Sequence, residues 1–302
     1  MYPKELFLGI SLYEIFVMIA MVAALFLADR MATKSGFSVK LQRQLIYGAI
    51  GAILVGFLGA VLFQAVYDFI ETGVWNIKSG MTFYGGLLFG AGTFLIIWFF
   101  LSKPFGIDEE AKRRFPDIAN IAACVVSMAH GIGRLGCLFA GCCHGQKTNA
   151  WYGIMHYAVD MQTGELISLG KYVPTQLFEA VFLLALSALL FWLYFKKNNA
   201  KIGNGTWAKI KDLPLLPVYM IVYGVWRFFI EYARGDDRGQ TIVPFLTPSQ
   251  LIAVLLVLGG VAYFFVWYFA FRKRKTGAEP QAIEEAETAE KLEAAEAEEK
   301  EK

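Results

Sequence analysis

The sequence predicts an all-α, polytopic integral membrane protein with seven transmembrane helices, from its composition, its apolar segments and the placement of its charges. Of 302 residues, 57% are hydrophobic and only 18% are charged, a departure from soluble domains in the direction of membrane proteins. Seven apolar segments are long enough, or nearly so, to cross a hydrocarbon core about 30 Å thick as helices. They lie at residues 6–27, 46–67, 84–101, 117–139, 175–195, 214–232 and 249–271.

Several of these segments have features that bear on their assignment. The first follows a single Lys4 without a small-residue cleavage site, so we expect it to remain as a helix. The third and sixth are short, and the fourth is unusual because it holds several glycines beside Arg134. Glycines and charge at membrane depth indicate close helix packing or a water-lined cavity. The fifth begins after Pro174, a residue suited to a helix start.

The basic residues predict the orientation. Lys and Arg are enriched in cytoplasmic connections. Seventeen of them lie in the first, third and fifth connections and after the last segment, against six in the N-terminus and the alternate connections. This alternation predicts an N-terminus outside and a C-terminus in the cytoplasm. The transmembrane domain then covers 1–275, and 276–302 is a cytoplasmic tail, rich in Glu and Ala, that forms a solvated helix or is disordered.

Two arginines lie inside apolar segments. Arg134 and Arg227 would each cost about 2.5 to 3.5 kcal/mol near a bilayer centre, so we expect an anionic partner for them. A guanidinium group matches a phosphate well. Arg227 has Glu231 four residues later on the same helical face, which leaves open an internal ion pair. Arg134 has no carboxylate at helical spacing in its segment, so its partner must come from elsewhere.

Two further motifs leave alternatives open. Tyr84, between glycines at the outer end of the third segment, is either an interfacial tyrosine or a site residue. Cys137, Cys142, Cys143 and His144 suggest a metal site, but no Cys-x-x-Cys is present. Adjacent cysteines are also hard to point at one ion, which favours free or packing cysteines, with a disulfide possible at an oxidising face. The residues together indicate an outward-facing polar cavity suited to an anionic lipid headgroup.

Four ordered blocks resemble the phosphatidylglycerol-prolipoprotein diacylglyceryl transferases of bacterial inner membranes, over about residues 6 to 271. They are Phe83-Tyr-Gly-Gly86, Gly133-Arg-Leu-Gly136 with Gly141 and Gly145, Pro174-Thr-Gln-Leu-Phe-Glu179, and Tyr223-Gly-x-x-Arg-Phe-x-x-Glu231 followed by Arg234.

The resemblance implies a multi-pass enzyme of the bacterial cytoplasmic membrane. It would transfer the diacylglyceryl group of phosphatidylglycerol to the lipobox cysteine thiol in the signal peptide of a preprolipoprotein, the first step of lipoprotein maturation. Arg134 and Arg227 would be catalytic and hold the lipid phosphate, with Tyr84 as a further catalytic candidate. Neither metal, other cofactor nor nucleic acid is expected. The substrate-binding residues would also include Tyr13, Gly136, Cys137, Cys142, Gly145, Glu231 and Arg234.

The chain departs from the family pattern at several of these positions. The family commonly has His where this chain has Tyr84, and a tyrosine with a pKa of about 10 is a poor base at neutral pH. Cys137 and Ala140 stand at Asn positions, and Cys142 stands at a Glu position. The alternatives are a paralogue that transfers lipid to another acceptor, a phospholipid-binding transporter, and a redox or metal protein built on Cys137, Cys142 and Cys143.

Overall fold

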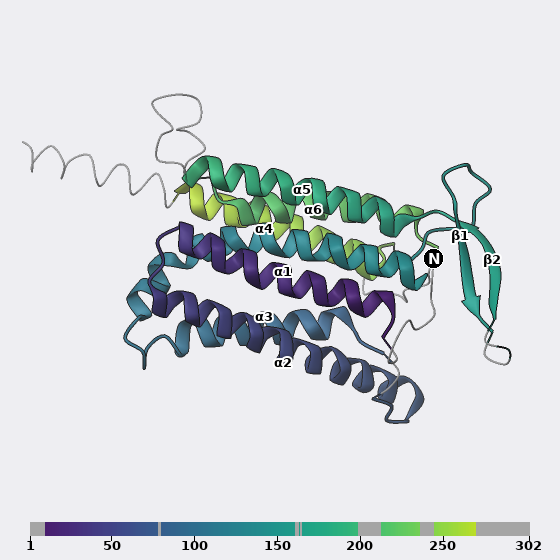
Figure 1. Ribbon diagram of the computed structural model, residues 1–302, viewed down its shortest axis with the longest axis horizontal. Coiled ribbons are helices and arrows are strands. Elements are labelled where there is room, and N and C mark those ends of the chain that lie inside the picture. Colours follow the sequence, from purple (N-terminus) through teal and green to yellow (C-terminus); the bar gives the residue numbers. More distant parts are fainter. Residues whose placement is uncertain are drawn as a thin grey trace, which may run out of the picture.

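The computed structural model is mostly helical (Figure 1). It describes residues 10–77, 80–160, 163, 165–198, 213–235 and 245–269. The tail predicted for 276–302 lies outside this range. The helices are α1 (Leu12–Lys34), α2 (Val39–Thr72), α3 (Phe83–Phe100), α4 (Asp108–Ala140), α5 (Thr175–Asn198), α6 (Leu215–Ile230) with the 3₁₀ turn η2 (Glu231–Ala233), and a last helix Pro248–Phe269.

Among the described residues, six helices are long and apolar enough to cross a membrane: α1, α2, α4, α5, α6 with η2, and Pro248–Phe269. Each overlaps a segment expected from the sequence, so the prediction of a multi-pass helical membrane protein is confirmed. Helix α3 coincides with the third expected segment and has the same length, 18 residues, but it is shorter than each of these six spans. A seventh span and the orientation of the chain therefore stay predictions.

Helix α4 lies at the centre of the bundle. It packs against α1 and α5, while α2 pairs with α3 at one side and α6 packs against α4 and α5 at the other (Figure 1). Polar side chains link the central helices: Ser127 Oγ donates to the Leu183 carbonyl at 3.1 Å, and Ser187 Oγ donates to the Cys124 carbonyl at 3.1 Å. Such bonds hold transmembrane helices together where the hydrophobic effect between them is weak.

Glycines bring α2 and α3 into backbone contact. A Cβ atom at Gly85 would lie 2.5 Å from the Gly59 carbonyl oxygen and 2.5 Å from the Phe63 Cβ. A Cβ atom at Gly56 would lie 3.0 Å from the Gly86 carbonyl oxygen. Small residues at a membrane helix interface allow this approach, and dispersion contacts then stabilise the pair. The glycine pattern of the third segment is therefore explained by packing.

We expect Gly85→Ala to destabilise the protein by about 1 to 3 kcal/mol, because the added methyl group overpacks the contact between α2 and α3. The matched control is Gly92→Ala in the same helix, where an added Cβ meets no atom within 4 Å. The melting temperature in detergent should fall for Gly85→Ala and stay the same or rise for Gly92→Ala. Equal melting temperatures for the two variants would contradict the packing.

Several helix boundaries of α1, α2 and α4 differ from the expected ones by five residues or more, and two of the starts have a local explanation. Helix α1 begins at Leu12, because Ser11 and Glu14 form a capping box at its start. Helix α4 begins at Asp108, nine residues before the expected 117, and continues through Pro116. Three acidic residues in its first turn favour this start, because they interact with the positive end of the helix dipole.

A β-hairpin lies between α4 and α5 and projects beyond the end of the bundle (Figure 1). Strands β1 (Ile154–Val159) and β2 (Leu166–Tyr172) pair antiparallel, with an irregularity between His156 and Tyr157. The all-α expectation thus describes the membrane region, and this connection adds a small sheet. The β-branched and aromatic residues of this connection favour strands, a signal that a search for long apolar segments does not detect.

Candidate active site

The candidate site lies at the end of the bundle that carries the hairpin. The C-terminal end of α4, the start of α5 and the end of α6 meet there. Gly145, after α4, forms a bridge with Arg234, after α6, and its N–H donates to the Val173 carbonyl at 2.8 Å. A Cβ atom at Gly145 would lie 2.4 Å from the Ala233 carbonyl oxygen. Only glycine therefore fits where these three segments converge.

Arg134 on α4 pairs with Glu179 on α5. Its Nη2 donates to Oε1 at 3.2 Å, and its Nε lies 3.0 Å from Oε2 without hydrogen-bond geometry. The Glu179 side chain is fully buried and also accepts from the Tyr223 hydroxyl on α6 at 2.9 Å. His130, one turn before Arg134, packs edge-on against Tyr223. This carboxylate therefore joins three helices.

Arg227 on α6 forms a second ion pair. Its Nη2 lies 2.8 Å from Glu231 Oε2 and donates to Ser249 Oγ, on the last helix, at 2.8 Å. Glu231 is buried, accepts from the Thr247 hydroxyl at 3.0 Å, and lies 3.9 Å from Arg234 Nε. The Arg227 Nη1 atom is buried and has no hydrogen-bond partner among the described residues.

Both buried arginines have the anionic partner that the sequence led us to expect, and in each case it is a carboxylate of this chain. Glu179 neutralises Arg134 from another helix, and Glu231 neutralises Arg227 from the same helix, as the ion-pair alternative proposed. Paired charges avoid most of the cost of burial. The case for an anionic ligand therefore depends on the unused donor of Arg227.

Tyr13 and Gly136 mark the contact between α1 and α4. A Cβ atom at Gly136 would lie 3.2 Å from both Tyr13 Cδ2 and Phe16 Cβ. Gly136 directly precedes Cys137, so Tyr13 packs at the end of α4 that carries the cysteines. Both residues thus lie beside Cys137, and close packing of α1 on α4 explains why a glycine stands at position 136.

The cysteines converge on one point. The sulfur atoms of Cys137, Cys142 and Cys143 all lie within 4.8 Å of one another. Helix α4 ends in a Schellman motif: the Cys142 N–H donates to the Cys137 carbonyl at 3.3 Å, and the Gly141 N–H donates to the Leu138 carbonyl at 3.4 Å. This motif brings the side chains of Cys137 and Cys142 together.

Cys143 then turns back toward that pair, because it adopts the left-handed conformation with φ of 60°. Adjacent cysteines are hard to point at one ion when the backbone is regular, and the left-handed conformation of Cys143 removes this obstacle. Non-glycine residues adopt this conformation uncommonly, and the sequence carried no signal of it.

Buried polar residues of α5 hold the cysteine turn. Thr175 Oγ1 donates to the Cys143 carbonyl at 2.9 Å, and Gln176 Nε2 donates to the Cys142 carbonyl at 2.8 Å. Neither side chain is exposed. The block that begins at Pro174 thus supplies the anchors of the turn as well as Glu179.

His156 of the β-hairpin packs beside His144, which follows the C-terminal end of α4. His156 is 1% exposed, and its ring lies 4.6 Å from that of His144. Burial, followed by the nearby His144, lowers the pKa of His156 to about 4. The ring is therefore neutral at neutral pH, as expected for a packed histidine.

The described residues bring together nine of the ten candidate site residues, from Tyr13 to Arg234. The tenth, Tyr84, is the second residue of α3, and its side chain lies outside the part of the chain that the structure describes. Glu179 belongs to one of the blocks shared with the family but was not among the candidate site residues. The feature of the sequence that could have indicated a site role for Glu179 is that it is a lone carboxylate in an apolar segment. Ser249 and Gln176 carried no comparable signal.

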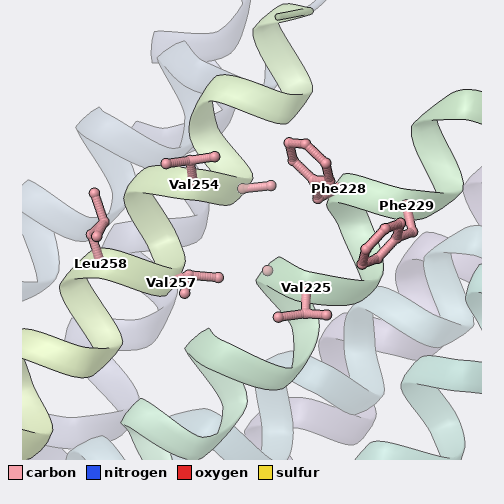
Figure 2. A pocket seen from close by; sticks show the side chains of 8 residues that line it. Val225, Phe228, Phe229, Val254, Val257 and Leu258 are labelled. Atoms are coloured by element: carbon pink, nitrogen blue, oxygen red, sulfur yellow. The ribbon is translucent and has the colours of Figure 1, made fainter.

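The structure also contains an apolar groove (Figure 2). It runs between α6 and the last helix, and Figure 2 shows Val225, Phe228 and Phe229 of α6 facing Val254 and Val257. Arg227 precedes Phe228 on α6 and bonds to Ser249 on the last helix, so the guanidinium group and the groove share the same two helices.

Comparisons with known proteins identify the family of the chain. The sequence model of the prolipoprotein diacylglyceryl transferase family matches residues 4–267. The chain belongs to this family.

Similar proteins have names that agree with the family. The phosphatidylglycerol–prolipoprotein diacylglyceryl transferase 2 of Clostridium perfringens is 28% identical over 262 residues, which cover 84% of this chain and 90% of the relative. The corresponding transferase of Clostridium tetani is 28% identical, covering 86% of this chain and 94% of its own. That of Oleidesulfovibrio alaskensis is 27% identical, covering 90% and 92%. Family and structure together define a multi-pass membrane transferase.

Proposed function

We propose that the protein transfers the diacylglyceryl group of phosphatidylglycerol to the lipobox cysteine thiol of prolipoproteins in the bacterial cytoplasmic membrane. The names of the relatives support these substrates. The observation that carries the proposal is the buried Nη1 of Arg227, which has no partner among the described residues. A buried donor of this kind is costly unless a ligand satisfies it.

In this proposal the lipid phosphate accepts a hydrogen bond from Arg227, and one acyl chain lies in the apolar groove between α6 and the last helix. Arg134 stabilises the charge that grows on the phosphate as the bond to the glyceryl carbon breaks. Glu179 and Glu231 orient the two guanidinium groups, and Arg234 closes the site beside Gly145. Tyr13, Gly136, Cys137, Cys142 and Gly145 form its walls, and Tyr84 is a further candidate from α3.

The topology proposed for the enzyme has seven spans, with α3 as the third, an N-terminus outside and a cytoplasmic acidic tail at 276–302. The basic residues support it, because they alternate between the two sides in this arrangement. The site then opens at the outer face, where signal peptides reach the membrane surface.

The test is transfer by the purified protein in nanodiscs. Phosphatidylglycerol with labelled acyl chains and a synthetic lipobox peptide are supplied, and the peptide is analysed by mass spectrometry. We expect the peptide to gain one diacylglyceryl group at its cysteine, and a peptide with serine at that position to gain none. Retained phosphatidylglycerol binding without transfer to the cysteine peptide would overturn the proposal and favour a different acceptor or a transporter.

A further inference from the structure

We propose that Cys137, Cys142 and Cys143 bind a divalent thiophilic metal ion such as zinc, whose fourth coordination position takes the acceptor thiol. The use of that position rests on the proposed function, whereas the ion site itself depends only on the cysteine geometry.

The three sulfur atoms are close to a metal-binding arrangement. They lie within 4.8 Å of one another. Sulfur atoms on a tetrahedral zinc ion lie about 3.8 Å apart, because each Zn–S bond is about 2.3 Å long. Side-chain shifts of about 1 Å therefore complete the site. The fixed backbone of the turn favours this, since the Schellman motif and the hydrogen bonds from Thr175 and Gln176 hold all three residues in place.

The surrounding charges favour a divalent ion. Three thiolates with one divalent ion carry a net charge of −1. Arg134 precedes Cys137 by three residues on α4, and Arg234 forms a bridge with Gly145, two residues after Cys143. These guanidinium groups stabilise such a complex. A monovalent ion would leave a charge of −2 at the same place, which is harder to hold in a partly buried site.

The fourth position is open to a ligand. Within the part of the chain that the structure describes, this group contains three cysteines and neither a histidine nor a carboxylate. Cys142 is exposed, so one side of the cluster faces outward. Structural zinc sites are closed by four protein ligands, whereas catalytic sites have three and keep one position for water or substrate. Three cysteine ligands with one exposed side therefore match a catalytic zinc site.

The proposed reaction needs a thiolate, and the ion would supply it. When the acceptor thiol replaces water on the ion, its proton passes to solvent, because a coordinated thiol is deprotonated. The sulfur then attacks the glyceryl carbon that bears the phosphate. A C–S bond forms, the C–O bond breaks with its electrons going to the oxygen, and glycerol phosphate leaves. The resulting thioether is a weaker ligand, so water returns to the ion.

The position of the cysteines fits this role. Cys137 follows Arg134 by three residues, which places the two side chains as neighbours on one face of α4. A thiolate bound at the cluster would thus approach the phosphate ester from beside the guanidinium group that stabilises the leaving group.

The first experiment measures metal binding by the purified, reduced, full-length protein. Cadmium is titrated as a probe of thiolate ligands and is followed by ultraviolet charge-transfer absorption. We expect one equivalent to bind, and Cys137→Ser, Cys142→Ser and Cys143→Ser each to weaken binding by about 100-fold. The control is Cys124→Ala, because Cys124 lies within α4 and outside the cluster; it should bind one equivalent as before.

The second experiment identifies the fourth ligand by X-ray absorption spectroscopy of the zinc-loaded protein. We expect three sulfur neighbours and one lighter atom, and four sulfur neighbours after the lipobox peptide is added. With the serine peptide, the number of sulfur neighbours should stay at three. Two results would overturn the proposed use of the fourth position. One is four sulfur neighbours before the peptide is added, and the other is only three sulfur neighbours after the lipobox peptide is added.

Transfer measurements separate this inference from the proposed function. Chelation should reduce transfer by about 100-fold, and one equivalent of zinc should restore it. Full transfer after chelation and in Cys142→Ser would leave the function standing and overturn the inference. A zinc site that gains the peptide sulfur without any transfer would support metal and thiol binding but overturn the function. Absence of bound metal, with a disulfide among the three cysteines in the native protein, would also overturn the inference.

Discussion

Arg134→Ala should lower the rate of diacylglyceryl transfer by about 100- to 1,000-fold, the effect of removing one donor that stabilises transition-state charge. It should also destabilise the protein, because the fully buried Glu179 loses its ion-pair partner. Breaking a buried pair in this way costs about 3 to 5 kcal/mol. Loss of activity in this variant alone would therefore not distinguish a catalytic arginine from a structural one.

The double variant Arg134→Ala with Glu179→Gln separates the two effects. Glutamine removes the unpaired charge and keeps an oxygen that can accept from the Tyr223 hydroxyl, which bonds to Glu179 at 2.9 Å. We expect the melting temperature in detergent to recover most of its loss while transfer stays low. Recovery of transfer together with stability would show that Arg134 serves the fold and has no direct part in the reaction.

The membrane helices were predictable because their signal is local. A continuous apolar run must satisfy its own backbone hydrogen bonds in lipid, and a helix does so within the segment. Residues 175–195 and 249–271 consequently match α5 and Pro248–Phe269 within a few residues. Start positions were less predictable where polar residues cap or extend a helix outside the apolar run, as at Ser11 and Asp108.

The partners within the site were less predictable because they depend on which helices are neighbours. The pair between Arg227 and Glu231 follows from a spacing of four residues, and the sequence indicated it as an alternative. The pair between Arg134 and Glu179 joins residues 45 positions apart, and no periodicity reveals it. The convergence of the cysteines requires the left-handed backbone of Cys143, which local propensity argues against.

The second large effect is expected at Arg227. Arg227→Lys keeps a positive charge beside Glu231, so the buried carboxylate retains a partner and the melting temperature should change little. Lysine lacks the planar guanidinium fork, however, and cannot donate to Ser249 and to a ligand from two fixed nitrogens. We therefore expect kcat/KM for phosphatidylglycerol to fall by about 100-fold, measured by labelled lipid transfer to the lipobox peptide.

Arg114→Lys is a suitable control, because Arg114 is also ion-paired within a helix, with its Nη1 3.2 Å from Asp117 Oδ2 near the start of α4. It lies toward the opposite end of that helix from the site, so the substitution should leave transfer unchanged. If Arg227→Lys transfers the lipid at the wild-type rate, the unused Nη1 of Arg227 does not bind the phosphate. If both variants lose activity equally, the effect follows from general loss of arginine packing. A loss confined to Arg227→Lys, with stability retained, would indicate that the fork of this guanidinium group recognises the lipid phosphate.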